Sequence, residues 1–218
     1  MQGLRSGRAG HIVRRRMPPL PLTPKQLFER LDALGIAHRT YSHPPVFTVA
    51  EATALRGSLP GGHCKSLFLK DKKGGFWLAV MLEERRIDLK KLASLLGAPR
   101  FSFGSAADLY KVLGVRPGSV TPFALVNDVE HLVTPVLDAA MLDHDPLNYH
   151  PLATDRTTAI AAADLLRFIS VCGHLPRIST SPASSASQQP PPADRAARLA
   201  ILASGALAIA GACHHVVR

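Results

Sequence analysis

Apolar residues recur at helical spacing in several stretches of the chain, and each of these stretches follows a capping signal. The first begins at the pair Thr23-Pro24, repeats leucine every third or fourth residue, and ends at Gly35. A polar cap followed by the same periodicity indicates further helices, and the second of them opens with the capping box TVAE. The further predicted helices are 48–57, 88–97, 105–114 and 163–171.

Short apolar runs bounded by turn residues predict strands that form two pairs. The predicted strands are 64–70, 76–82, 120–126 and 131–138. A Gly-rich turn at 71–75 joins the first pair, and Asn127-Asp128 joins the second. Helices and hairpins alternate without a regular βαβ rhythm, so we expect an α/β fold of the α+β kind, with a mixed or antiparallel sheet and helices around it.

Residues 18–177 carry all of these elements and form one predicted domain. Residues 1–17 hold five arginines, lack an apolar period and are not followed by the apolar segment of a secretory signal, so we predict a basic disordered extension. Residues 178–198, rich in Ser, Pro and Gln, are predicted to be a disordered linker. The tail 199–218 opens with a fifteen-residue apolar run. A spanning helix needs roughly 20 residues, so we interpret the tail as a short appendage of unknown role, with a membrane tether as the alternative.

The formal net charge of +10 resides largely outside the predicted domain. Residues 18–177 hold 18 basic and 15 acidic side chains, so the domain is only mildly basic and its composition alone does not indicate a nucleic-acid partner. Cys64, Cys172 and Cys213 form no CxxC pair, which argues against a disulfide framework and against a zinc ribbon. A reducing cytoplasm is therefore the expected compartment.

Several familiar motifs of enzyme chemistry are absent from the sequence, namely GxxxxGK[ST], GxGxxG and GxSxG. The histidines of the domain match neither HExxH nor a CxxC…HxxxH spacing, so we predict no metal site. They are His38, His43, His63, His131, His144, His150 and His174. The acidic pair Glu83-Glu84 lies beside Arg85-Arg86 and is interpreted as a solvated turn.

Cys64 is a candidate nucleophile, with His63 or His150 as its base, because a thiolate needs such a partner. A cysteine at the start of an apolar strand is more commonly a small core residue, and we favour that interpretation.

Lys65 is a stronger candidate, because it opens the apolar strand that contains Leu67 and Leu69. Strand alternation places it on the same face as these two leucines and opposite Ser66. Its amine therefore either extends past the strand edge into solvent or points into a cavity, and the segment alone does not choose between the two.

Two polar loops favour the cavity. Residues 117–122 bracket a glycine and two hydroxyl residues with prolines, which gives a stiff loop whose backbone groups can face a ligand. Residues 147–158 place His150, Pro151 and hydroxyls between apolar elements, where functional residues often lie. Together with Lys65, these loops predict one pocket.

Three segments of the chain resemble the YbaK-like aminoacyl-tRNA editing domains, which occur as insertions in bacterial prolyl-tRNA synthetases and as freestanding proteins. The segments are GGHCKSLFLKDKKG, GVRPGSVTPFALVND and PLNYHPLATDRTTAI. The resemblance covers roughly residues 20–177 and is greatest to the freestanding ProXp-ala type, which hydrolyses alanine mischarged onto proline tRNA. It implies a mixed, barrel-like sheet surrounded by helices.

The resemblance also implies the site. Lys65, Gly118 and His150 match the family's pocket residues and are our predicted catalytic residues. The predicted substrate-binding residues are Ser66, Ser119, Thr121, Pro122 and Pro151. Relatives commonly carry Asn where this chain has Ser66, so the contact made there is expected to differ. Lys70, Lys72 and Lys73 are predicted to bind tRNA phosphates, with a solvated turn as the alternative.

The implied function is hydrolysis of the ester on mischarged tRNA(Pro), with Ala-tRNA(Pro) as the expected substrate and water as the nucleophile. No cofactor or metal is expected, and neither DNA nor a membrane is an expected partner, whereas prolyl-tRNA synthetase or the elongation machinery is. Two alternatives stay open. One is a deacylase for Cys-tRNA(Pro) or another small aminoacyl-tRNA, and the other is a non-catalytic tRNA- or protein-binding module with the same fold.

Overall fold

The computed structural model describes residues 20–43 and 59–180. The predicted extension 1–17, the predicted helix 48–57 and the tail 199–218 lie outside the described residues, as does the linker from residue 181 onward. Within the described ranges, no helix combines the length and the apolar character that crossing a bilayer requires.

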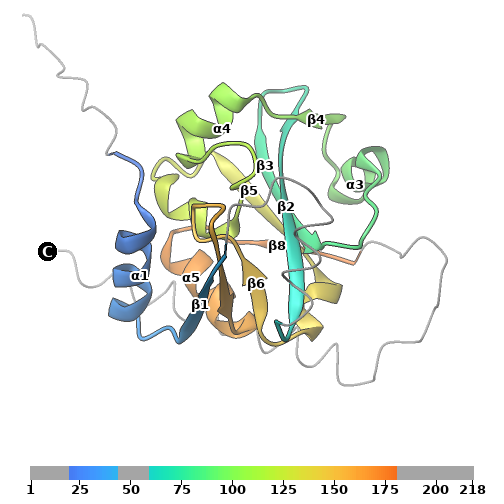
Figure 1. The fold of residues 1–218 in the computed structure, drawn as a ribbon. Helices are drawn as coiled ribbons and strands as arrows, with labels where there is room; N and C mark the ends of the chain where they lie inside the picture. Colours follow the sequence, from blue (N-terminus) through green and yellow to red (C-terminus); the bar gives the residue numbers. More distant parts are fainter. Residues whose placement is uncertain (1–19, 44–58, 181–218) are drawn as a thin grey trace, which may run out of the picture.

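Helices and strands alternate along the described chain (Figure 1). The helices are α1 (Pro24–Ala33), α3 (Leu89–Leu96), α4 (Ala106–Leu113) and α5 (Ala162–Val171), with 3-10 helices η1 (Pro122–Asn127) and η2 (Ala139–Asp143). The strands are β1 (His38–Ser42), β2 (Gly62–Asp71), β3 (Phe76–Leu82), β4 (Phe101–Phe103), β5 (Val133–Asp138), β6 (Leu147–Tyr149), β7 (Arg156–Ile160) and β8 (Arg177–Ser179).

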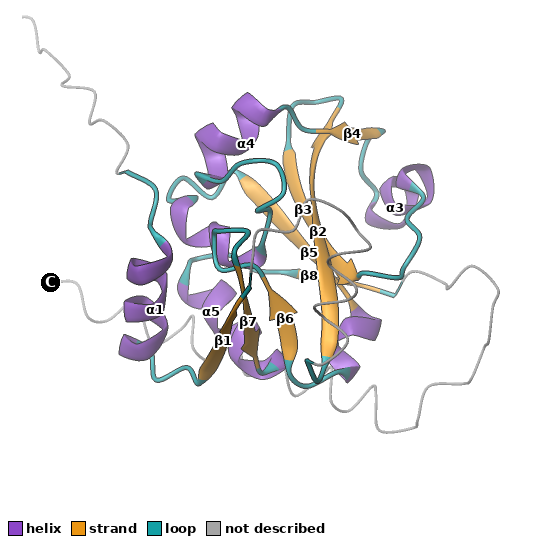
Figure 2. Ribbon diagram, viewed as in Figure 1, coloured by secondary structure: helices purple, strands orange, loops and turns teal. Residues whose placement is uncertain are grey.

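The strands form one eight-stranded sheet in the order β1-β7-β6-β2-β3-β5-β8, with β4 paired to β2 (Figure 2). Pairing is antiparallel in β1·β7, β6·β7 and β2·β3 and parallel in β2·β6, β3·β5 and β5·β8. The predicted mixed sheet with surrounding helices is confirmed.

Local capping signals account for α1, α3 and α4, as the sequence predicts, whereas α5 begins without a side-chain cap. The Thr23 side chain accepts a hydrogen bond from the Gln26 N–H at the start of α1, and Asp88 caps α3 in the same way. Gly97 and Gly114 end α3 and α4 in the left-handed conformation that glycine adopts without a steric penalty.

Side chains of β3 alternate between two apolar clusters. Leu78 and Val80 face the larger cluster, to which α1, α4, α5 and η1 contribute, whereas Ala79 and Met81 face a smaller cluster with α3. In Figure 1, α3 accordingly lies across the sheet from α1 and α5. Because both faces are buried here, β3 consists of a continuous apolar run.

The strand predicted at 120–126 is wrong, because residues 122–127 form the 3-10 helix η1. Pro122 occupies the first turn, where its fixed φ and missing N–H are tolerated, and the Thr121 hydroxyl accepts from the Phe123 N–H. Residues 121–125 are all buried, and a short buried run lacks the periodicity that separates a strand from a helix.

Two smaller differences lie in segments that the sequence presents as loops. The polar segment 147–158 contains β6 and the start of β7, which pair antiparallel. Residues 178 and 179, which the sequence assigns to the start of the linker, instead belong to strand β8, which pairs with β5. The parallel partners of β6 and β8 are β2 and β5, which lie far away in sequence, so no local pattern predicts these two strands.

Candidate active site

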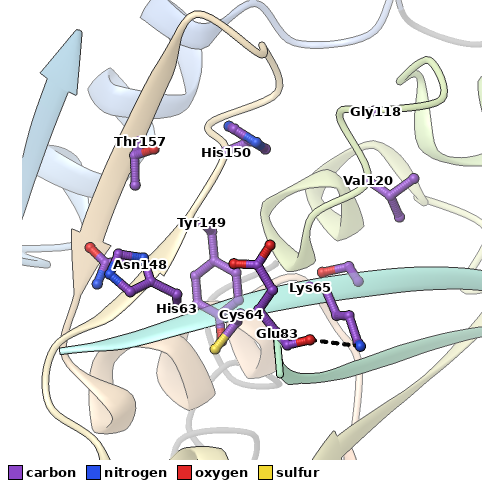
Figure 3. A pocket seen from close by; sticks show the side chains of 11 residues that line it. His63, Cys64, Lys65, Glu83, Gly118, Val120, Asn148, Tyr149, His150 and Thr157 are labelled. Carbon is purple, nitrogen blue, oxygen red and sulfur yellow. Dashed lines mark hydrogen bonds between the residues drawn. The ribbon is translucent and has the colours of Figure 1, made fainter. Parts of the chain in front are cut away.

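The candidate site lies beside the start of β2, where β2 and β6 pair over a short stretch. Gly62 and His63 pair with Leu147 and Asn148 of β6, and the pairing ends there. Beyond this point a cavity of about 190 Å³ lies between β2, the segment after β6 and the loop that precedes η1 (Figure 3). Its lining residues are His63, Cys64, Lys65, Ser66, Glu83, Gly118, Val120, Asn148, Tyr149, His150 and Thr157.

Three segments distant in sequence therefore meet, as the single predicted pocket requires. Lys65, Ser66, Gly118 and His150 all line the cavity. Four other predicted substrate-binding residues are buried and do not line the cavity, namely Ser119, Thr121, Pro122 and Pro151. Thr121 and Pro122 build the start of η1 and so position the loop rather than face the cavity.

The Lys65 amine is engaged by the backbone. Its Nζ donates to the main-chain carbonyl oxygens of Glu83 at 2.8 Å and Arg85 at 2.5 Å. In Figure 3 the amine points away from Gly118 and His150. The side chain thus ties the start of β2 to the turn that follows β3.

The loop before η1 borders the cavity at Gly118 and Val120. Gly118 has φ +92°, and the Ser119 N–H closes the turn by donating to the Arg116 carbonyl at 3.0 Å. That bond occupies the Ser119 donor, so this N–H does not serve a ligand. The N–H groups of Gly118 and Val120 donate to no acceptor in ranges 20–43 and 59–180.

His150 is oriented by a backbone acceptor. Its Nδ1 lies 3.0 Å from the Arg156 carbonyl oxygen, and because a carbonyl only accepts, Nδ1 carries the proton. The neutral ring then has its acceptor at Nε2. On the same wall, His43 Nε2 lies 3.0 Å from the Thr157 hydroxyl, and the rings of His43 and His150 are 6.2 Å apart.

Cys64 and Tyr149 form a protonated part of the lining. Burial raises the pKa of the Cys64 thiol to about 12, and burial likewise raises the pKa of the Tyr149 phenol. Cys64 also packs against the main core. A thiol with this pKa is neutral near pH 7, so the core interpretation holds and Cys64 is not an activated nucleophile.

This environment predicts low reactivity at Cys64. With intact folded protein at pH 8, alkylation of Cys64 by iodoacetamide is expected to be at least tenfold slower than that of a free thiol, whose pKa is near 8.5. Mass-spectrometric peptide mapping of a time course measures the rate. The unfolded chain is the control and should react at the ordinary rate, while fast modification in the folded state contradicts the assignment.

Glu83, Asn148, Tyr149 and Thr157 line the cavity without having been predicted to bind substrate. The solvated-turn interpretation of Glu83-Glu84 is correct only for Glu84, which is exposed, whereas Glu83 is half-buried. The Glu83 N–H donates to the His63 carbonyl at 2.9 Å, so Glu83 directly extends the β2·β3 ladder. In the sequence, the one signal for a role of Glu83 was its position directly after Leu82, the last apolar residue of β3.

The three lysines predicted to bind tRNA lie at the far end of β2. Lys72 and Lys73 are exposed in the β2–β3 turn. Lys70 instead donates to Asp108 at 3.1 Å and lies over the Phe76 ring, so it already has partners. Among the described residues, no cluster of His, Cys, Asp or Glu has the arrangement of a metal site.

Comparison with known proteins decides the family. The model of the aminoacyl-tRNA editing domain matches residues 43–168, which is more than half of the chain and includes the whole cavity lining. The chain belongs to the aminoacyl-tRNA editing domain family. The predicted resemblance is thereby confirmed, and with it the assignment of the chain as an editing deacylase.

Two similar proteins have names that refer to prolyl-tRNA synthetase or to prolyl-tRNA editing. Over 156 residues the chain is 40% identical to the Danio rerio "Prolyl-tRNA synthetase associated domain-containing protein 1", covering 71% of this chain and 85% of the relative. It is 31% identical to the "Prolyl-tRNA editing protein ProX" of Acetoanaerobium sticklandii, covering 66% and 89%. A crystal structure of a candidate trans-editing enzyme for prolyl tRNA synthetase has the same fold, with TM-score 0.56, 20% identity and coverage of 71% and 94%.

Proposed function

We propose that this editing domain hydrolyses the aminoacyl ester of mischarged tRNA(Pro), and that Ala-tRNA(Pro) is its main substrate. The observation that carries the proposal is the small cavity, whose lining brings the Gly118 loop together with His150. These are the groups that ester hydrolysis by water needs when no side chain acts as nucleophile.

The size of the cavity agrees with a small aminoacyl group. Its volume of about 190 Å³ lies below the roughly 300–1,000 Å³ of sites that enclose drug-sized ligands. Discrimination by size in the synthetase itself is weak, since a missing methylene changes binding by only about 1–3 kcal/mol. A second site that admits the smaller side chain and hydrolyses its ester completes the selection.

In the proposed mechanism, water attacks the ester carbonyl carbon, and the carbonyl oxygen becomes an oxyanion. The Gly118 and Val120 N–H groups donate to this oxyanion as its charge develops. The Nε2 of His150 accepts a proton from the water, directly or through the neighbouring ribose hydroxyl. The intermediate then expels the 3′ oxygen, which takes up a proton, so that free amino acid and deacylated tRNA leave.

Lys65 acts in this proposal chiefly as a positioning residue. Its amine holds the carbonyls of Glu83 and Arg85, which fixes the turn that borders the cavity. A direct contact with the terminal phosphate or with the developing charge, as the resemblance implies, requires the amine to leave those carbonyls.

Replacing Lys65 by methionine is expected to lower kcat/KM about tenfold or more, because two hydrogen bonds from a charged donor are lost while the apolar stem is kept. Single-turnover deacylation of Ala-tRNA(Pro) measures the effect. Lys25, exposed on α1, provides the matched Lys25→Met control. Wild-type activity in Lys65→Met would remove this residue from the mechanism.

The substrate assignment is tested with alanyl, cysteinyl and seryl esters of tRNA(Pro). The proposal expects the alanyl ester to have the highest kcat/KM. A higher value for the cysteinyl or seryl ester would reassign the substrate within the family. Tight binding of all three without hydrolysis would identify the chain as a non-catalytic tRNA-binding module.

Exposed lysines in the β2–β3 turn predict salt-dependent tRNA binding. In the proposal Lys72 and Lys73 contact backbone phosphates, so the double variant Lys72→Ala/Lys73→Ala should reduce the slope of log affinity against log salt by about 1 to 2. Filter binding across a salt series measures the slope, with Lys25→Ala as the control. An unchanged slope shows that this turn does not contact tRNA.

A further inference from the structure

Tyr110 and Arg116 form an exposed pair of an aromatic ring and a cation close to the cavity. Tyr110 lies on α4 and is 52% exposed, and the Arg116 guanidinium carbon lies 5.8 Å from the centre of its ring. This separation is that of a cation–π contact. Arg116 is exposed as well, so both side chains are accessible to a ligand that approaches from solvent.

The ring of Tyr110 stays accessible because its neighbours on the helix are small. The residues three and four positions before it on α4 are Ala107 and Ala106, and both are exposed. A helical side chain leans over the turn that precedes it, so the ring leans toward two methyl groups instead of a long side chain. The exposed part of the ring is therefore a flat surface on which another ring can stack.

A defined turn connects this pair to the cavity. The Ser119 N–H closes the turn 116–119 by donating to the Arg116 carbonyl at 3.0 Å. Pro117 is the second residue of the turn, and Gly118 is the third, with φ +92°. These are the features of a type II turn, whose residues have fixed positions relative to one another. Gly118 lines the cavity, as Figure 3 shows, so Arg116 is held two residues from the lining.

The charge of this surface favours a polyanion. Arg116 and Lys111 are exposed, and neither forms an ion pair with a carboxylate in the part of the chain that the structure describes. The acidic residue of α4, Asp108, lies 3.1 Å from the Lys70 amine, so its charge is already balanced. A guanidinium beside a ring keeps N–H groups that can donate to a phosphate. Aromatic rings next to basic side chains are typical of proteins that bind unpaired nucleotides.

We propose that Tyr110 and Arg116 bind the unpaired nucleotide that precedes the aminoacylated nucleotide of tRNA. The base stacks on the Tyr110 ring, and the Arg116 guanidinium donates to an adjacent phosphate. This inference rests on the proposed function, because an ester held at Gly118 directs the rest of the tRNA past the exposed residues 116–118. Both are positioning residues, which hold the 3′ end and take no part in the chemical step.

The first test compares deacylated tRNA(Pro) with and without the base in question, so it needs no hydrolysis. One tRNA is intact, and the other is abasic at the nucleotide before the terminal adenosine. In filter binding at fixed salt, the full-length wild type should bind the intact tRNA at least fivefold more tightly. Tyr110→Ala should bind both tRNAs equally, with the affinity of wild type for the abasic one. Tyr110→Phe keeps the ring and should retain the wild-type preference.

A wild-type preference that persists in Tyr110→Ala, or equal affinities of the wild type for the two tRNAs, would overturn the stacking contact. Failure of the proposed function gives a different result, in which no ester is cleaved while the preference for the intact tRNA remains.

A second test addresses the phosphate contact. Arg116→Gln should reduce the slope of log affinity against log salt by about 1, because one phosphate contact is lost. Arg30, exposed on α1, provides the matched Arg30→Gln control, which should keep the wild-type slope. An unchanged slope in Arg116→Gln contradicts the assignment of Arg116 to a phosphate.

Discussion

Replacing His150 by alanine is expected to lower kcat for hydrolysis of Ala-tRNA(Pro) by about 10²- to 10⁴-fold, the usual contribution of a positioned acid–base group. The expectation rests on the hydrogen bond between Nδ1 and the Arg156 carbonyl, which directs the acceptor Nε2 away from the backbone. Removing the ring removes this acceptor while the backbone donors of Gly118 and Val120 stay in place. Substrate binding should therefore change much less than kcat.

Single-turnover measurements with radiolabelled aminoacyl-tRNA distinguish the chemical step from binding. Added imidazole should restore part of the activity of His150→Ala, because the deletion leaves space beside the Arg156 carbonyl. His150→Gln retains a polar side chain without a basic nitrogen and should be nearly as impaired as alanine. If either variant hydrolyses the ester at the wild-type rate, His150 is not the proton acceptor.

Replacing Phe123 by alanine is expected to destabilise the domain by about 3–5 kcal/mol, the usual range for deleting a buried aromatic ring. Phe123 is fully buried in η1, and its ring packs edge-on against Tyr149 and Phe168, with centroid separations of 5.9 and 5.6 Å. The contact with Tyr149 links the core directly to the cavity lining. The variant should therefore also lose deacylase activity at temperatures where it is still folded.

Urea unfolding followed by circular dichroism measures the loss as a lower midpoint at an unchanged slope. Phe103 is the matched control, because its ring is 64% exposed on β4. Phe103→Ala should change stability by no more than about 0.5 kcal/mol. Comparable stability of Phe123→Ala and wild type would mean that η1 does not anchor the loop.

Local signals explain which parts of the fold were predictable. The helices predicted within the described residues were correct, because signals such as the Thr23 cap and the Gly97 terminator are local in sequence. The β2–β3 hairpin was correct because its turn is also local. The predicted strand at 120–126 failed because a run buried on all sides carries no period. Strands β6, β7 and β8 were missed because each pairs with a strand far away in sequence, namely β2, β1 and β5.

The sequence by itself determined the family. It also predicted that Lys65, Ser66, Gly118 and His150 line one pocket, because these residues lie in long, ordered motifs. Only the tertiary structure decided what each of them faces. It directs the Lys65 amine to backbone carbonyls, occupies the Ser119 N–H within a turn, and places the Glu83 carboxylate at the cavity. The physical reason is that the direction of a side chain depends on pairing between strands far apart in the chain, which a motif does not encode.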